Sequence, residues 1–313
     1  MQFKMDRFYF APLQGATDFI YRNIYNAHFN CIDKYFTPFI RIEKNTLRNS
    51  YKKEIQAEQN GITIPQFLSK NIDDTKFLLD RIIENKHSEI NWNLGCPYPM
   101  VAKKGMGSGL IKEYEQIDKI LDFIFKNYSI NLSVKCRLGY DSIDEIDQLI
   151  PVFNNHPLHE VIIHPRIGKQ LYKGEVFLEK LEEIIPKLKH PLVYNGDIYT
   201  PEIFNKLKQR FPNIDRWMIG RGLLQDPFLV MKIKEKSYQS NTLIEFYNDI
   251  FSEYERNLNG PGHLLSKLKE FWMYFAHSFP EQEKLYKAIK KSKSMEAYYK
   301  AINKFNINEF RNS

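Results

Sequence analysis

The sequence predicts an α/β fold, namely a (β/α)₈ TIM barrel followed by a C-terminal all-helical domain. Short apolar, β-branched runs alternate with helical patterns, and this alternation recurs about eight times over some 230 residues. The pattern then changes to one helix after another, without strand signals. Alternating strands and helices indicate a parallel sheet with helical crossovers. This number of units favours a closed barrel over an open sheet.

Eight runs have the composition of buried strands. Runs such as VIIH and LVY are apolar without strict alternation, which is typical of strands that are covered on both faces. The expected strands span residues 7–13, 33–40, 61–68, 89–95, 131–139, 160–166, 191–197 and 216–222.

Helical patterns lie between these runs. Thr17 or Asp18 is expected to cap the first helix. Further along, Phe77, Leu78 and Ile82 recur at the spacing of an amphipathic helix, which an Asp is expected to cap. The expected helices span residues 17–29, 73–85, 113–128, 141–153, 176–188 and 201–211.

The chain beyond residue 231 reads as helices only, with a clear break at the segment NGPGH. This part is basic, because it carries 14 Lys and Arg against 10 Asp and Glu. We therefore expect two domains, a barrel at residues 1–231 and a helical domain at residues 232–313.

Composition limits the class of protein. The whole chain of 313 residues has 45 Lys and Arg against 38 Asp and Glu, a formal charge of +7 that permits a polyanionic partner without requiring one. Three widely spaced cysteines favour a reducing compartment over a disulfide framework. No apolar run approaches the roughly 18 residues of a membrane span, and no signal peptide is recognisable. We expect a cytoplasmic protein without membrane contact and, since CxxC and HExxH motifs are absent, without a metal.

Polar or glycine residues end nearly every expected strand. In a β/α barrel the active site lies at this end of the strands. Each residue alone has a structural explanation, such as a solvated strand end or a satisfied core histidine, but together they indicate a functional ring. The residues are Pro12, Gln14, Gly15, Gln66, Asn93, Gly95, Cys96, Lys135, Arg137, His164, Arg166, Asn195, Gly196, Asp197, Gly220, Arg221 and Gly222.

Lys135 indicates the kind of ligand that this ring holds. A lysine that projects into a barrel mouth needs an electron-rich partner, because an unpaired buried ammonium is unfavourable. A flavin fits, since its reduced form carries negative charge that a lysine stabilises, and Gln66 could bond the same heterocycle. The glycine-bearing turns NGD and IGRG follow the last two strands, where barrels often bind phosphate.

Cys96 stands between a glycine and a proline in NLGCPYPMVAKKGMGSG, a setting that a core cysteine does not need. A thiol with an ordinary pKa of about 8.5 is protonated at neutral pH and can donate a proton. Facing a flavin, it would complete the reduction of a carbon–carbon double bond. A nucleophilic role would need a neighbouring base, and the local sequence offers none. Cys31 and Cys136 have no such setting and are expected in the core.

Six motifs in order resemble the tRNA-dihydrouridine synthases of the bacterial type over the first 225 or so residues. They are APLQGATD, NLGCP, VKCRLG, IIHPR, YNGDI and MIGRG. The helical C-terminal region is similar to that family's RNA-binding domain. The resemblance implies an enzyme that holds FMN, is reduced by NADPH and reduces uridine to 5,6-dihydrouridine in tRNA, in the D-loop. A monomer is expected.

The resemblance also assigns roles to residues. Cys96 matches the proton donor to C5 of uracil, and His164 matches a flavin-site histidine. Leu13 stands where the family often has Met, Tyr98 stands where it has a small residue, and HPRI replaces HGRT. The cofactor contacts that the resemblance implies are Pro12, Leu13 and Gln14 in the first turn, Gln66 and Lys135 at the heterocycle, and Asn195, Gly196, Asp197, Gly220 and Arg221 at the phosphate.

A uracil inside folded tRNA is inaccessible, so it must be everted into the barrel mouth. The basic helical domain would supply phosphate contacts and read RNA by shape, although a solvated helix face explains any one lysine equally well. The candidate RNA contacts are Lys267, Lys269, Lys287, Lys290, Lys291 and Lys293.

Two other functions stay open at this point. The first is an FMN barrel that acts on a free pyrimidine-like small molecule, although such a substrate does not need a basic helical domain. The second is a non-catalytic tRNA-binding protein that keeps an inherited barrel, a reading that the intact NLGCP motif and Lys135 disfavour.

Overall fold

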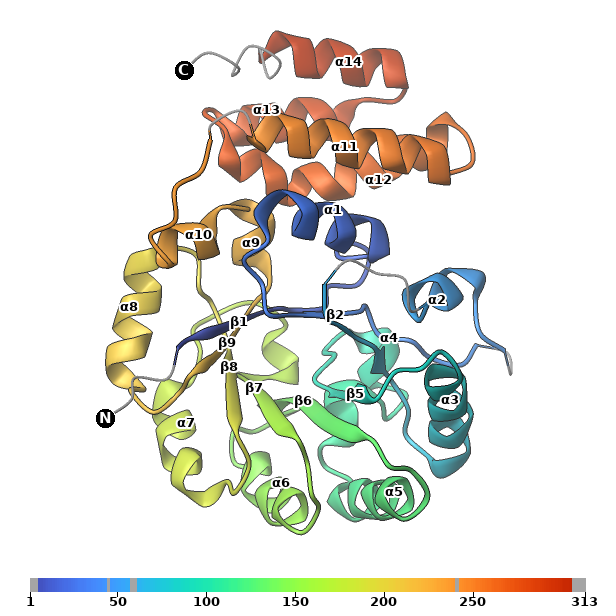
Figure 1. Ribbon diagram of the computed structural model, residues 1–313, viewed down its shortest axis with the longest axis vertical. Helices are drawn as coiled ribbons and strands as arrows, with labels where there is room; N and C mark the ends of the chain where they lie inside the picture. Colours follow the sequence, from blue (N-terminus) through green and yellow to red (C-terminus); the bar gives the residue numbers. More distant parts are fainter. Residues whose placement is uncertain (1–4, 44–45, 57–60, 240–241, 306–313) are drawn as a thin grey trace.

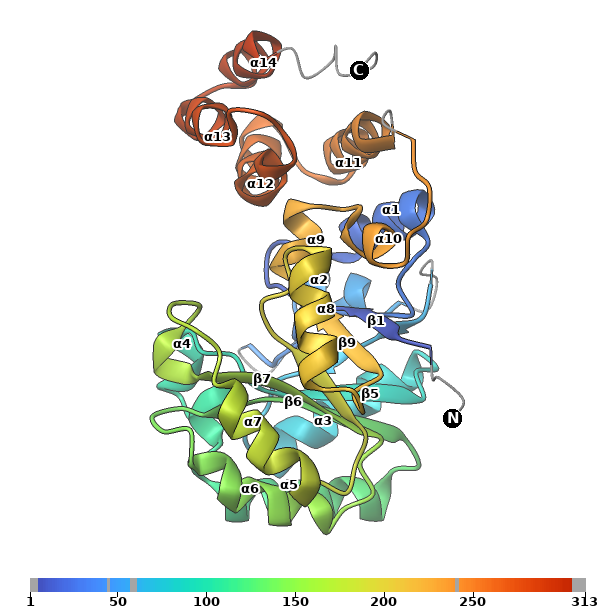
Figure 2. The same cartoon turned by 90° about the vertical axis from the view of Figure 1, so that its left-hand side faces the viewer.

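The computed structural model describes residues 5–43, 46–56, 61–239 and 242–305. A barrel forms the larger part, and a layer of C-terminal helices covers one side of it (Figures 1 and 2). The strands within the described residues are all parallel and form one sheet. They are β1 (Arg7–Phe10), β2 (Lys34–Phe36), β3 (Thr63–Ile64), β4 (Gln66–Phe67), β5 (Glu89–Leu94), β6 (Asn131–Gly139), β7 (Glu160–Ile167), β8 (Leu192–Asn195) and β9 (Arg216–Ile219).

The sheet closes through the third expected strand. The strand order is β3-β2-β1-β9-β8-β7-β6-β5-β4, so β3 and β4 stand at its two ends. These two are halves of one segment, interrupted at Pro65, which has no N–H to donate. The Pro65 carbonyl still accepts from Asn91 N at 2.9 Å. All eight expected strands are therefore present and the predicted eight-stranded barrel is confirmed.

Helices surround the barrel as expected, with differences at their ends. Asp18 caps α1, where its carboxylate accepts from Tyr21 N at 3.0 Å. Asn71, rather than an Asp, caps α3. The outer helices are α1 (Phe19–Phe29), α3 (Ile72–Glu84), α5 (Tyr114–Asn127), α6 (Glu145–Asn154), α7 (Leu178–Ile184) and α8 (Pro201–Arg210), and the shorter ones are α2 (Asn49–Glu54), α4 (Pro99–Ala102), α9 (Arg221–Gln225) and α10 (Leu229–Ile233).

Two helix boundaries differ from the prediction for identifiable reasons. The helix expected from residue 141 begins at Glu145, because the Glu145 carboxylate accepts from the N–H groups of Tyr140 and Asp141 at 2.6 and 3.1 Å and holds a turn there. The helix expected to reach residue 188 ends at Ile184, since Pro186 allows only a short 3₁₀ turn (η3, Ile185–Lys187).

The C-terminal layer packs on α1 and α9. Phe246 contacts the rings of Tyr21, Tyr25 and Phe29, with ring centres 5.2–6.2 Å apart, so the hydrophobic core continues from the barrel into the layer. The layer contains α11 (Thr242–Asn257), α12 (Pro261–Phe275), the 3₁₀ turn η4 (Ala276–Ser278), α13 (Gln282–Lys291) and α14 (Met295–Lys304).

The change of architecture falls between the end of α10 and the start of α11. Helix α10 packs on α8 and α9 and so accompanies the barrel. The division at residue 231 into two domains stays a prediction. Among the helices of the described ranges, none combines the length and apolar character needed to span a bilayer.

Candidate active site

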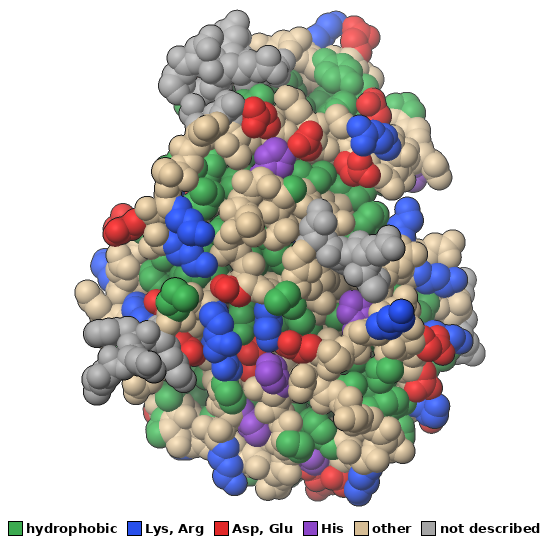
Figure 3. All heavy atoms as spheres, in the orientation of Figure 1, with side chains coloured by type: hydrophobic (Ala, Val, Ile, Leu, Met, Phe, Trp, Pro, Cys, Tyr) green, Lys and Arg blue, Asp and Glu red, His purple; other side chains and the backbone are tan. Residues whose placement is uncertain are grey.

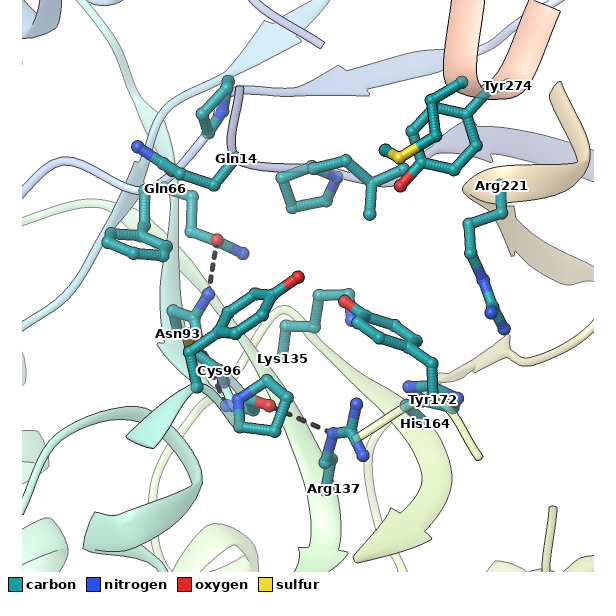
Figure 4. Close-up of a pocket in the computed structure, with 18 of the residues that line it drawn as sticks. Gln14, Gln66, Asn93, Cys96, Lys135, Arg137, His164, Tyr172, Arg221 and Tyr274 are labelled. Atoms are coloured by element: carbon teal, nitrogen blue, oxygen red, sulfur yellow. Dashed lines mark hydrogen bonds between the residues drawn. The ribbon is translucent and has the colours of Figure 1, made fainter. Parts of the chain in front are cut away.

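A cavity of about 300 Å³ opens at the C-terminal end of the strands (Figure 4). The structure brings to it eight of the residues predicted as catalytic or cofactor-binding: Pro12, Leu13, Gln14, Gln66, Cys96, Lys135, His164 and Arg221. Asn93, Gly95 and Arg137, which belong to the same predicted ring, line it as well. The other four predicted cofactor contacts, Asn195, Gly196, Asp197 and Gly220, lie beside the cavity and do not line it.

Several lining residues were not predicted as cofactor contacts. Tyr172 follows β7, and Met273 and Tyr274 come from α12, so the helical layer forms part of the cavity wall. No periodic pattern marks these positions, although the loop after a barrel strand is a place to search for Tyr172. The remaining lining residues are Pro38, Phe39, Asn93, Gly95, Pro97, Tyr98, Arg137 and Gln225.

A chain of buried amides fixes one side of the cavity. Gln66 is fully buried; its Oε1 accepts from Asn93 Nδ2 at 2.6 Å, and its Nε2 donates to Asn91 Oδ1 at 2.7 Å. Asn91 in turn donates to Ser133 Oγ at 2.8 Å. The bonds run between neighbouring strands and set the amide orientation of Gln66, which has one N–H left for a ligand.

The glycine-rich segment behind Cys96 holds this cysteine in place. Gly107 has a φ of +58°, and a Cβ added there would lie 2.8 Å from Cys96 Cβ, so only glycine fits. The N–H and the hydroxyl of Ser108 both donate to the Cys96 carbonyl at 3.0 Å. Asn93 Oδ1 accepts from the N–H groups of Gly95 and Cys96 at 2.9 and 2.8 Å. The loop therefore fixes Cys96 from both sides.

Cys96 borders the cavity and is otherwise surrounded by apolar side chains. It is 7% exposed and packs with Phe39, Leu68 and Val101. Burial raises the pKa of the thiol, although the Tyr98 N–H and nearby cations act in the opposite direction. The thiol consequently keeps its proton at neutral pH.

Lys135 projects from β6 into the cavity and has neither a hydrogen-bond nor an ion-pair partner in the described part of the chain. Burial, together with the charge of Arg137, lowers the pKa of its ammonium from 10.5 to about 8. An unpaired cation of this kind is unfavourable unless a ligand compensates it.

Arg137 and Tyr172 form the wall next to Lys135. Arg137 Nε donates to the Gly95 carbonyl at 3.1 Å, and its Nη1 donates to the Ile167 carbonyl at 2.8 Å. Its guanidinium lies 5.3 Å from the ring centre of Tyr172, and that of Arg221 lies 4.7 Å away. The two cations hold the tyrosine ring in a fixed position.

His164 is neutral. Burial and the charges of Arg137 and Lys135 lower its pKa well below the ordinary value. Its Nε2 lies 3.0 Å from Arg166 Nη1. Since a guanidinium only donates, Nε2 must accept, and the ring proton therefore resides on Nδ1.

Asp197, which follows β8, forms ion pairs with an arginine of β7 and with an arginine that follows β9. It accepts from Arg166 Nη2 at 2.5 Å and from Arg221 Nη2 at 2.6 Å. Burial opposes ionisation, but these two arginines hold the pKa of Asp197 below its ordinary value. The Ile198 carbonyl would lie 2.0 Å from a Cβ on Gly222, so glycine lets the two predicted phosphate turns touch.

The predicted RNA contacts fall into two groups. Lys267 donates to the Gly15 carbonyl at 2.5 Å and pairs with Asp18 at 2.7 Å, and Lys269 donates to the Ser292 carbonyl, so both are engaged within the protein. On the face shown in Figure 3, basic and acidic side chains are interspersed. The other four predicted contacts, which are exposed on α13 and just after it, are Lys287, Lys290, Lys291 and Lys293.

The sequence model of the family described as dihydrouridine synthase matches residues 9–308. The chain belongs to the dihydrouridine synthase family. A probable tRNA-dihydrouridine synthase of Helicobacter pylori is 25% identical over 279 residues, covering 80% of this chain and 81% of the relative. A protein of the same description from Staphylococcus epidermidis is 28% identical over 274 residues, covering 80% of this chain and 79% of the relative. Membership of the dihydrouridine synthase family makes the chain an oxidoreductase.

A solved structure supports the fold of this dihydrouridine synthase. A variant of NCR from Zymomonas mobilis matches with a TM-score of 0.50 at 13% identity, covering 77% of this chain and 90% of that one. At this identity the likeness shows the fold alone.

The HPRI departure from the dihydrouridine synthase motif is accommodated by a bulge. The register between β6 and β7 shifts between Arg137 and Gly139, opposite Pro165. A proline is tolerated at a bulge because no ladder hydrogen bond is required there. Ile167 N donates to Gln170 Oε1 at 2.8 Å, so the loop after β7 is still anchored.

Proposed function

We propose that the protein reduces uridine in tRNA to 5,6-dihydrouridine with FMN as its cofactor and NADPH as the reductant, and that Cys96 is the proton donor. One observation carries the proposal: the Cys96 thiol and the unpaired Lys135 ammonium border the same cavity at the mouth of the barrel. Family membership supplies the substrate class, and this pair of groups suggests the chemistry.

The residues present fit a flavin. Lys135 lacks a compensating charge, and Gln66 keeps one amide N–H for a heterocycle. At the other end, Arg221 borders the cavity while Asp197 orients it. We assign Pro12, Leu13 and Gln14 to the flavin edge, and Asn195, Gly196 and Gly220, with Arg221, to its phosphate. Reduced FMN, when bound, supplies the hydride that C6 of uracil receives.

Cys96 supplies the proton that C5 of uracil receives. Its raised pKa keeps the thiol protonated until the base is bound, and the Tyr98 N–H and the Arg137 charge favour the thiolate that remains afterwards. The fixed loop around Cys96 limits the positions that the sulfur can take. The same segment of the chain thus supplies the proton donor and fixes the position of its sulfur.

His164 and Lys135 act by position and charge. Neutral His164 can donate a hydrogen bond through Nδ1 but adds no further positive charge to the site. The Lys135 ammonium stabilises negative charge on a ligand beside it, and a reduced flavin carries such a charge. Neither residue needs to transfer a proton for the reduction of the C5–C6 bond to balance.

We assign tRNA contact to the helical layer, with residues 232–313 as a tRNA-binding domain and the D-loop as the region that is modified. Exposed Lys287, Lys290, Lys291 and Lys293 are the best placed of the six lysines. Since Lys267 and Lys269 already bond within the protein, their contribution to binding RNA would be indirect.

The test uses purified protein and tRNA from a strain that lacks this gene. The parent protein should carry a yellow flavin and form dihydrouridine when NADPH is added. Cys96→Ala should keep the flavin and lose about 10²–10⁴-fold in rate, the usual contribution of a general acid. A colourless protein that binds tRNA would exclude the proposed chemistry, and an equally fast Cys96→Ala variant would exclude the proposed role of the thiol.

A free pyrimidine-like substrate is the alternative, and removal of the helical layer is not a clean test of it. Met273 and Tyr274 of α12 line the cavity, so deleting the layer would also remove a wall of the site. Comparison of tRNA with uridine as substrates for the intact protein is the sharper experiment.

A further inference from the structure

Two tyrosines border the cavity, and one of them, Tyr274, also packs against the hydrophobic core. Tyr98 lies two residues after Cys96 and is 48% exposed, while Tyr274 is half-buried on α12. Within the described ranges, neither ring stacks on another aromatic ring or a cation, and neither hydroxyl has a hydrogen-bond partner. These rings are therefore available to a ligand.

Tyr172, the third tyrosine of the cavity, is different. The guanidinium groups of Arg137 and Arg221 lie against its ring, at 5.3 and 4.7 Å from the ring centre. Its aromatic surface is already used by these cations. Tyr172 is consequently a fixed wall, whereas Tyr98 and Tyr274 present free surfaces.

The free rings lie close to the reacting groups and to each other. Tyr274 stands across the cavity from Cys96 (Figure 4). Tyr98, Tyr172 and Tyr274 all line the same cavity. The three phenols thus converge on one opening.

Helix α12 is anchored over this opening. Lys267 Nζ donates to the Gly15 carbonyl at 2.5 Å, and Ser278 Oγ, just after α12, donates to the Gln225 carbonyl at 2.7 Å. These bonds lie on either side of Tyr274 in the sequence and attach the middle of the helix and the turn after it to the barrel. The position of Tyr274 is therefore fixed relative to Cys96.

We propose, on the basis of the proposed function, that Tyr98 and Tyr274 form an aromatic clamp that stacks on the ring surface of the everted uracil that the flavin and the Cys96 thiol leave free, and that this clamp favours substrate over product. Uracil is planar, and proteins that act on everted bases commonly hold them against aromatic side chains. Reduction makes C5 and C6 tetrahedral and removes the planar π system. The clamp loses its stacking partner when the reaction is complete, which promotes release of the product.

The charge of the cavity supports a nucleotide as the occupant. Lys135, Arg137 and Arg221 all line it, and no carboxylate is among the lining residues. A cationic cavity with free aromatic rings at its opening matches a phosphate-bearing base better than a neutral apolar molecule.

The test measures the binding of one tRNA in two forms to the flavin-loaded protein without NADPH. The first form is an unmodified transcript, and the second is the same transcript after conversion by the parent protein. The parent should bind the unmodified form more tightly. In Tyr98→Ala and Tyr274→Ala this preference should fall by roughly 5-fold to 150-fold, the equivalent of about 1–3 kcal/mol of stacking per base. Tyr98→Phe and Tyr274→Phe should keep it, because they keep the ring.

Tyr114→Ala is the matched control, since Tyr114 is a 40% exposed tyrosine outside the cavity and should change nothing. Thermal unfolding and flavin content are measured for every variant, so that a change in preference caused by misfolding or by loss of flavin is recognised. An unchanged preference in both alanine variants would overturn the clamp while leaving the reductase intact. If the parent forms no dihydrouridine at all, the proposed function fails and the clamp fails with it.

Discussion

Replacing Lys135 with methionine should stabilise the flavin-free protein while weakening its hold on the flavin. The ammonium has no partner among the described residues, so folding must desolvate a charge without compensation. The lowering of its pKa from 10.5 to about 8 measures that cost. At about 1.4 kcal/mol per pKa unit it corresponds to at most about 3.5 kcal/mol at neutral pH.

The pH dependence follows from proton linkage. Between pH 8 and pH 10.5 the unfolded chain binds this proton and the folded chain does not, so the stability of the parent rises across this window. The advantage of Lys135→Met should thus be full below pH 8 and fade toward pH 10.5. Denaturant unfolding of the flavin-free proteins, at several pH values, measures it.

The matched control is Lys119→Met, because Lys119 is an exposed lysine on α5 and should change the free energy of unfolding little. Flavin titration should show weaker binding to Lys135→Met alone. If Lys135→Met is less stable than the parent at pH 7, or if its advantage does not change with pH, the reasoning about the uncompensated ammonium is wrong.

Three further predictions concern the loop, the layer and the phosphate turns. Gly107→Ala should lower activity more than Gly105→Ala. Alanine is strained by about 1–2 kcal/mol at both positions because both have positive φ, but only at Gly107 would the new Cβ collide with Cys96. Equal rates for the two variants would refute this. Lys267→Met should lower the melting temperature. In a double-mutant cycle with Asp18→Asn the two losses of stability should not add, because the side chains pair at 2.7 Å. A loss of tRNA affinity without a change in melting temperature would instead support the RNA contact predicted from the sequence. Arg221→Met should weaken binding of FMN but not of riboflavin; equal losses would remove Arg221 from the phosphate site.

The barrel could be predicted from the sequence because each strand is marked by residues that are close together in the chain. Buried parallel strands read as apolar runs, and their polar ends mark one rim of the barrel. Gln66, Lys135 and His164 could be placed at the cavity because each closes an apolar run in the sequence, although β6 and β7 continue beyond Lys135 and His164. Only the split at Pro65, which produces β3 and β4, changes the strand count.

The rest depends on long-range packing that periodicity does not report. Tyr274 lies on α12, far along the chain from every strand end, and nothing in its neighbourhood in the sequence places it opposite Cys96. Lys267 resembled an RNA contact because its partner, Asp18, is remote in sequence. The glycine of the NGD turn was expected to admit a phosphate, yet a Cβ on Gly196 would lie 2.3 Å from the Tyr194 hydroxyl, so packing alone already requires glycine there.

The central claim is that the Cys96 thiol completes the reduction of an everted uracil over a flavin in this cavity. Its most direct test is a single-turnover measurement without oxygen, in which NADPH reduces the bound flavin and unmodified tRNA is then added. NADPH should reduce the parent and Cys96→Ala at the same rate, and tRNA should reoxidise the flavin of the variant at least about 100-fold more slowly than that of the parent. Reoxidation at equal rates, or no reoxidation of the parent by tRNA, would contradict the account.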